Sequence, residues 1–221
     1  MKRMWNQTIH HHMEENLSLY VFTTVLFIMG VVFGSLIVGA LTVEQRQDLL
    51  GYLQHFFNGL NQGDIASPAV ALKHTAAHHL KYVGLMWILG LSIIGAPLVF
   101  VLIFLKGLVI GFTVGFFVRE LSWQGLGFIF LSIFPQNVIV VPAMIIVSVA
   151  SISFSLLLLR NRFIQRRGTI YPQFMSYSFL VLLMACLLML ASVFEAYISP
   201  KFMQEAVGAI GVTWPVMHRY F

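Results

Sequence analysis

Long apolar runs separated by short polar segments divide this chain into candidate membrane-spanning helices. A helix needs about 20 mostly apolar residues to cross the hydrocarbon core of a bilayer. Apolar runs near that length predict spans at residues 19–41, 82–105, 138–159 and 175–198. A further apolar stretch, residues 107–134, contains charged residues in its middle. The pattern predicts an all-α fold, a polytopic membrane helical bundle with about five crossings and a single integral membrane domain over residues 19–221.

The stretch at 107–134 is predicted to be a discontinuous third segment. Arg119 and Glu120 divide it into the pieces Gly107–Val118 and Trp123–Phe134. Each piece would form only about 18 Å of helix, which is too short to cross a bilayer alone. We expect the two pieces together to make one broken crossing that neighbouring helices cover. A re-entrant hairpin, which would leave three crossings, is the alternative.

Residues 42–81 form the only sizeable polar connection. Thr42 and Gln45 have the spacing of a capping box, and apolar residues such as Leu49 and Leu53 then follow at helical intervals. An amphipathic surface helix is therefore expected here. Ser67 and Pro68 indicate a second helix start.

Composition and charge support the membrane assignment. Of the 221 residues, 59% are hydrophobic and 10% are charged, whereas soluble domains are about 25% charged. Four of the basic residues fall in the loop at 160–174, namely Arg160, Arg162, Arg166 and Arg167. The positive-inside rule places this loop and the N-terminus, residues 1–18, in the cytoplasm, with 42–81 outside. The positive net charge therefore follows from topology, and no nucleic-acid partner is expected.

Glycines at four-residue intervals predict close helix packing. They form two sets, Gly30 and Gly34 in the first span and Gly107, Gly111 and Gly115 in the third segment. Small residues at this spacing let two helix backbones approach closely. The contact would lie within the bundle or between copies in a homo-oligomer.

Three histidines, His74, His78 and His79, are weak candidates for a metal site. Two histidines one helical turn apart without a third ligand are a weak signal, and polar residues at the membrane boundary are the preferred interpretation. The sequence contains no motif typical of a catalytic or cofactor-binding site. Neither an enzyme activity nor a cofactor is therefore expected.

Glu195 is the most informative single residue because it lies near the end of an otherwise apolar span. An unpaired charge there is costly. Glu195 would either pair with a basic or hydroxyl group inside the bundle, contact another protein, or reach the outer headgroups. Arg119 and Glu120 would lie at a wet break in the bundle or in a surface loop.

Three segments of the chain resemble the stage II sporulation protein M family, namely KYVGLMWILGLSIIGAPLVFVLIFLKGLVIGFTVGFFV, FPQNVIVVPA and FEAYISP. The resemblance implies a multi-pass component of the engulfment machinery of endospore-forming bacilli. Such a protein would localise two peptidoglycan hydrolases, stage II sporulation proteins D and P, for cell wall remodelling at the mother-cell septal and engulfing membrane.

The resemblance also includes a motif at the start of the fourth span. Wider relatives carry P-H-G-x-x-E-x-P-A, and this chain keeps Pro135, Pro142 and Ala143 of it. Gln136 and Asn137 replace the histidine and glycine, and Val140 replaces the glutamate, whereas Glu195 matches the family's closing acidic residue. This departure argues against chemistry and for a binding platform.

The function expected from these observations is that of a non-catalytic scaffold which anchors the two hydrolases in a protein complex. A small-solute or ion transporter or channel that uses the broken segment and Glu195 is the alternative, since discontinuous helices and buried charges line substrate paths.

Overall fold

The computed structural model describes residues 16–62, 67–161, 170–200 and 202. All regular secondary structure within these ranges is helical, which confirms the all-α prediction. The long helices are α2 (Leu17–Gly39), α3 (Val43–Gln62), α4 (Pro68–Gly90), α5 (Gly95–Ser132), α6 (Phe134–Arg160) and α7 (Tyr171–Tyr197).

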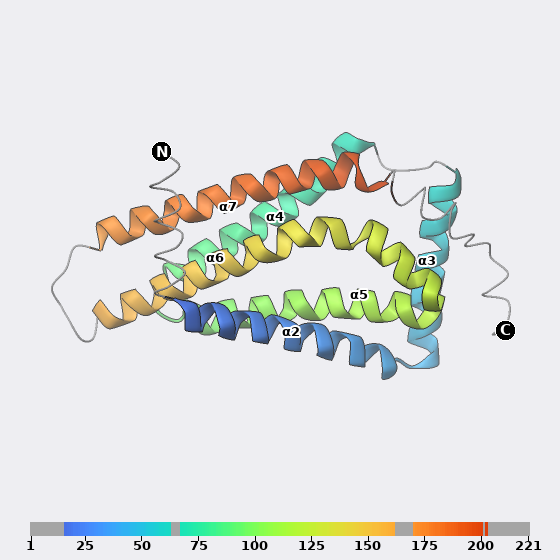
Figure 1. Ribbon diagram of the computed structural model, residues 1–221, viewed down its shortest axis with the longest axis horizontal. Coiled ribbons are helices and arrows are strands. Elements are labelled where there is room, and N and C mark those ends of the chain that lie inside the picture. Colours follow the sequence, from blue (N-terminus) through green and yellow to red (C-terminus); the bar gives the residue numbers. More distant parts are fainter. Residues whose placement is uncertain (1–15, 63–66, 162–169, 201, 203–221) are drawn as a thin grey trace.

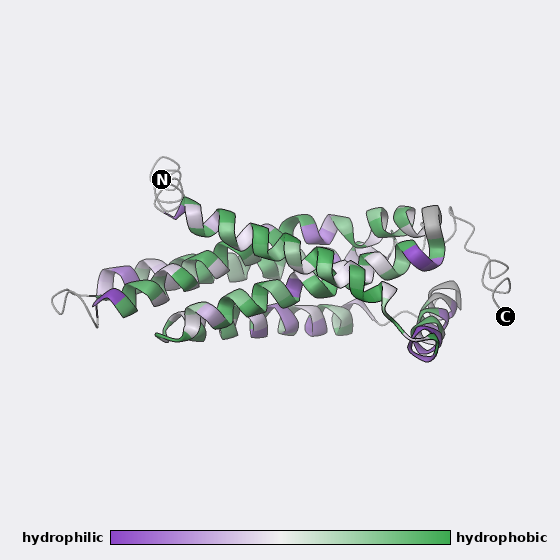
Figure 2. Cartoon of the chain, turned by 90° about the horizontal axis from the view of Figure 1, so that it is seen from below, coloured by the Kyte–Doolittle hydropathy of each residue, from purple (hydrophilic) through white to green (hydrophobic). Residues whose placement is uncertain are grey.

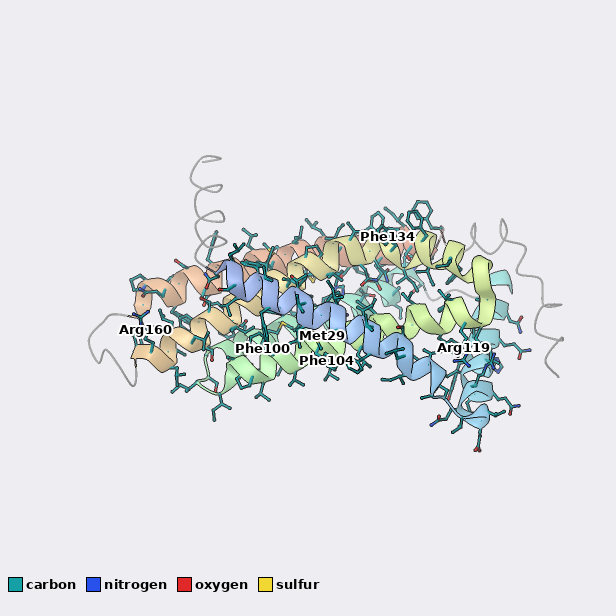
Figure 3. The ribbon with its side chains drawn as sticks, turned by 60° about the horizontal axis from the view of Figure 1, so that its bottom comes forward. Met29, Phe100, Phe104, Arg119, Phe134 and Arg160 are labelled. Carbon is teal, nitrogen blue, oxygen red and sulfur yellow. The ribbon has the colours of Figure 1, made fainter. Side chains whose placement is uncertain are left out.

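These helices form an elongated bundle with one helix across its end. α2, α4, α5, α6 and α7 lie alongside one another, and α3 lies across one end of them (Figure 1). The start of α2, the end of α6 and the start of α7 lie at the opposite end, where Arg160 is found (Figure 3). We call these the α3 end and the arginine end.

Among the described residues, four segments are long and apolar enough to cross a membrane. They are Leu17–Gly39, Gly95–Leu121, Phe134–Arg160 and Tyr171–Tyr197. Hydrophobic residues dominate these helices, whereas α3 is largely hydrophilic (Figure 2). The polytopic helical bundle is therefore confirmed.

The predicted span at 82–105 is wrong, because the chain reverses direction inside it. α4 ends at Gly90, residues 91–94 form a turn, and α5 begins at Gly95. The turn is tight, since a Cβ atom at Gly95 would overlap the carbonyl of Leu89. Pro97 lies in the first turn of α5, where its missing N–H leaves no hydrogen bond unmade.

The predicted broken crossing at 107–134 is also wrong. Residues 107–121 complete the crossing that begins at Gly95, and the chain then folds back. The rings of Phe117 and Phe128 stack with centroids 5.2 Å apart, whereas a straight helix would separate these residues by about 16 Å along its axis. A Cβ atom at Gly125 would overlap the carbonyl oxygen of Phe117. The helix therefore bends sharply near Arg119 and Glu120, where the sequence predicted a break.

α4 is less apolar than the other bundle helices and is held by polar contacts. The Trp87 indole donates to Ser178 Oγ at 3.3 Å, and the Tyr177 hydroxyl donates to the Trp87 carbonyl at 3.0 Å. Gly90 faces the same tyrosine, and a Cβ atom there would overlap the Tyr177 hydroxyl. Hydrogen bonds between helices are a common way to hold a polar helix inside a membrane bundle.

Candidate functional site

Helix α3 forms a platform across the bundle and begins with a complete capping box. Gln45 N–H donates to Thr42 Oγ1 at 3.3 Å, and Thr42 N–H donates to Gln45 Oε1 at 3.1 Å. This reciprocal pair satisfies two backbone donors at the start of a helix. The cap therefore fixes where α3 leaves the end of α2.

A bidentate ion pair fastens α3 to the bend of α5. Arg46 Nε donates to Glu120 Oε1 and Arg46 Nη2 donates to Glu120 Oε2, both at 2.8 Å. The Glu120 side chain is only 6% exposed. Two parallel charge-assisted hydrogen bonds define orientation as well as distance. Glu120 therefore sets the angle at which α3 lies across the bundle.

Arg119, the neighbour of Glu120, ties the same bend to α2. Its Nη1 donates to the carbonyl oxygen of Val38 at 3.3 Å. The last four carbonyls of a helix have no partner within the helix, and a basic side chain can satisfy one of them. Arg119 is therefore placed at the α3 end by this contact (Figure 3).

An apolar cluster supports the underside of the platform. It is formed by buried residues of α2, α3 and both sides of the bend in α5, namely Val38, Leu53, Phe116, Phe117, Leu121, Phe128 and Ile129. The opposite side of α3 is polar and accessible, with Glu44, Asp48 and His55 exposed and Tyr52 76% exposed. The platform therefore presents a fixed polar surface with an aromatic residue on it.

A second polar group lies inside the bundle, around Lys106 and Glu195. Both side chains are half-buried, on α5 and α7 respectively, and their opposite charges interact electrostatically. Lys106 Nζ also lies 5.6 Å from the centroid of the Tyr82 ring, within the range of a cation–π contact. Glu195 therefore has a basic counterpart within the bundle.

His79 and Ser192 form a buried hydrogen bond between α4 and α7. His79 Nδ1 lies 3.0 Å from Ser192 Oγ, and Ser192 Oγ lies 2.9 Å from the Leu188 carbonyl oxygen. Ser192 Oγ has one proton, which it can donate either to the Leu188 carbonyl or to His79 Nδ1, depending on the histidine tautomer. Both side chains are buried, so the bond holds α4 against α7.

The three candidate histidines differ in exposure, although the ring centroids of His78 and His79 are only 6.2 Å apart. His74 and His78 are exposed, whereas His79 is buried. Within the described ranges no group of three or more His, Cys, Asp or Glu side chains could hold a metal ion.

The two sets of glycines predicted from the sequence face each other between α2 and α5. A Cβ atom at Gly30 would overlap the Phe104 carbonyl, and one at Gly34 would overlap the Leu108 carbonyl. On the other helix, Gly107, Gly111 and Gly115 lie against the backbone of Phe27, Val31 and Ser35. This glycine face is therefore occupied within a single chain.

The residues from Pro135 to Pro142 form the first turns of α6. Pro135 occupies an early position where no N–H is required, and Pro142 lies inside the helix. Asn137 Nδ2 donates to the Ile133 carbonyl at 2.8 Å. Gln136 Oε1 is buried and has no hydrogen-bond partner in the described part of the chain. These side chains therefore belong to the bend between α5 and α6.

Sequence reasoning missed two residues of these sites, Arg46 and Lys106. Lys106 did carry a signal, since it is the only charged residue between Tyr82 and Val118. Arg46 carried none, because its partner Glu120 is 74 residues away. Parts of the predicted N-terminal segment 1–18 and arginine loop 160–174 lie outside the described residues.

Comparison with known proteins identifies the family. The family model of stage II sporulation protein M matches residues 23–200, which is most of the chain. Neither a curated protein nor a solved structure matches it. The matched region includes α3, the bend of α5 and the charges inside the bundle. With its four apolar membrane helices, this chain therefore belongs to the stage II sporulation protein M family and is a sporulation membrane protein.

Proposed function

We propose that this protein is a non-catalytic membrane scaffold. It would anchor and localise peptidoglycan hydrolases at the septal and engulfing membrane during endospore formation. The partners proposed from the family resemblance are stage II sporulation proteins D and P. The polar side of α3 would be the docking surface.

The Arg46–Glu120 ion pair is the observation that carries this proposal. A bidentate pair with both hydrogen bonds at 2.8 Å holds α3 in one orientation, and the buried cluster beneath it fills the underside. Docking to a surface that is already ordered costs less conformational entropy than docking to a mobile one. A fixed platform at the end of a membrane bundle is therefore suited to holding a partner.

The hydrogen bonds inside the bundle support a role without catalysis. His79 and Ser192 are both buried, and the hydrogen bond between them joins α4 to α7. Purified protein incubated with peptidoglycan is therefore expected to release no fragments. Cleavage by the purified protein without partners would contradict the proposal.

Co-purification from membranes tests the docking surface directly. Asp48→Asn combined with Tyr52→Ala removes a charge and an aromatic ring from the exposed side of α3. A buried interface tyrosine contributes about 2 kcal/mol or more to binding, so we expect about a 30-fold loss of affinity for the hydrolases. Arg160→Gln, an exposed charge change at the arginine end, is the matched control and should retain them. Equal recovery of the hydrolases with all three proteins would refute docking on α3.

A transporter or channel is the second candidate, and the Lys106–Glu195 pair is the observation that favours it. Ionisable residues inside membrane bundles often mark ion pathways. In liposomes, a transporter would show solute or ion flux that Glu195→Gln abolishes. Absence of flux from the wild-type protein, or flux that Glu195→Gln leaves unchanged, would count against this use of the pair.

A further inference from the structure

One face of α4 carries an exposed row of basic and titratable side chains. Lys73 and His74 are adjacent, His78 and Lys81 follow at intervals of four and three residues, and all four are exposed. The buried residues of this helix, which include His79 and Val83, lie on the opposite face. The row therefore lies on the outside of the bundle and not in its core.

The same face becomes apolar toward the arginine end. Leu85 is 44% exposed and Ile88 is 60% exposed, and both follow the basic row at helical spacing. Small residues, Ala77 and Gly84, lie between these side chains, and a Cβ atom at Gly84 would meet nothing within 4 Å. The face is therefore a strip with small residues between its larger side chains. Its first half is basic and its second half is apolar.

Positive charge is concentrated around His78. Lys106 from α5, together with His74 and Lys81 from α4, acts electrostatically on its ring. Tyr82 lies beside it, with ring centroids 5.8 Å apart. Lys73 and Lys81 are exposed on this face, and positive side chains on an outer surface favour an anionic ligand.

The position of the basic row relative to the membrane surface follows from how α4 is aligned with α7. The two helices run antiparallel, and His79 meets Ser192. His74 lies five residues beyond His79 toward the α3 end, and Tyr197 lies five residues beyond Ser192. His74 is therefore level with the end of α7, where the apolar region of the bundle ends. Lys81 lies about 10 Å deeper and can extend its ammonium group toward the same level.

We propose that this face of α4 binds an anionic phospholipid. Lys73, His74 and Lys81 would contact the phosphate of the headgroup, and an acyl chain would lie along Leu85 and Ile88. A soluble anion would use only the basic half of the strip, whereas a phospholipid matches both halves in the order in which they occur. Lysines near a membrane surface attract anionic lipids in this way.

Titration of the purified full-length protein with lipid tests the proposal. The protein is held in neutral detergent, and bound lipid is measured by native mass spectrometry. We expect phosphatidylglycerol to bind more tightly than phosphatidylcholine. Each lysine near the surface contributes about 1 kcal/mol, so Lys73→Gln with Lys81→Gln should weaken phosphatidylglycerol binding about 30-fold. Lys73→Arg with Lys81→Arg keeps the charge and should bind as the wild type does.

Two controls separate the lipid site from other causes. Water-soluble glycerol phosphate lacks acyl chains and is expected to bind at least about tenfold more weakly than the phospholipid. The melting temperature of each variant in phosphatidylcholine should equal that of the wild type, because the substituted side chains are exposed. If the double variant melts at a lower temperature than the wild type in phosphatidylcholine, Lys73→Gln alone should still weaken phosphatidylglycerol binding about fivefold. Equal binding of phosphatidylglycerol and phosphatidylcholine, equal binding of glycerol phosphate, or unchanged binding by the glutamine variants would each overturn the proposal.

Discussion

Loss of the Glu120 carboxylate should loosen α3 while the rest of the bundle stays intact. In Glu120→Gln the two charge-assisted hydrogen bonds from Arg46, both 2.8 Å long, are lost or weakened. Removing one partner of a fully buried pair costs about 3–5 kcal/mol. Glu120 is 6% exposed but Arg46 is 39% exposed, and water can solvate the freed guanidinium. We therefore expect a smaller cost, about 2–3 kcal/mol, for the attachment of α3.

Hydrogen exchange in nanodiscs measures this local free energy. Because 1.4 kcal/mol is a factor of ten, amides of α3 should exchange about 30- to 150-fold faster in Glu120→Gln than in the wild type. Amides of α6 should exchange at unchanged rates, since α6 does not depend on this pair. Gln54→Ala, an exposed change on α3 itself, is the control and should leave α3 protected. An α3 that exchanges at the wild-type rate in Glu120→Gln would refute the reasoning.

Other substitutions test the packing of the bundle. Gly111→Ala places a methyl group against the Val31 backbone and should lower the free energy of unfolding by about 1–3 kcal/mol, whereas Gly84→Ala meets open space and should raise it by about 0.5–1 kcal/mol. Thermal denaturation in nanodiscs compares the two, and equal effects would contradict the packing of α2 against α5. Tyr177→Phe removes the hydrogen bond to the Trp87 carbonyl and should lower the free energy of unfolding by about 1 kcal/mol in the same assay. An unchanged melting temperature would show that this bond does not stabilise the bundle. His79→Ala should also destabilise α4, by about 1–3 kcal/mol, yet leave hydrolase binding unchanged; a selective loss of binding would instead give His79 a functional role.

Three spans could be predicted from the sequence because polar residues bound them. The expected runs 19–41, 138–159 and 175–198 each fall largely within one helix, α2, α6 and α7 respectively. In these cases a single hydrophobic run corresponds to a single helix. The local signal and the fold therefore agree.

The turn between α4 and α5 could not be predicted from hydropathy. Its residues, Leu91 to Ile94, are mostly apolar and give no polar boundary. The first half of α4 carries lysines and histidines, so it does not resemble a span, although the bundle covers its inner face. The run 82–105 therefore joined the end of one helix to the start of the next.

The charged pair in the third segment indicated the place of an irregularity but not its form. Arg119 and Glu120 do mark where α5 bends, yet the following residues reverse direction instead of continuing the crossing. That reversal depends on contacts from Arg46 and Val38, which are far away in the sequence. Partners that are far apart in the sequence leave no local pattern. The Arg46–Glu120 ion pair could therefore not be predicted from the sequence and is seen only in the structure.

Direct binding of the hydrolases tests the central claim, that α3 is a fixed docking platform. The full-length protein is placed in nanodiscs, and its affinities for purified stage II sporulation proteins D and P are measured by biolayer interferometry. We predict specific binding that Asp48→Asn with Tyr52→Ala weakens about 30-fold and that Arg160→Gln leaves unchanged. Binding that is the same for all three proteins, or no binding to the wild type of either proposed hydrolase partner, would contradict the account.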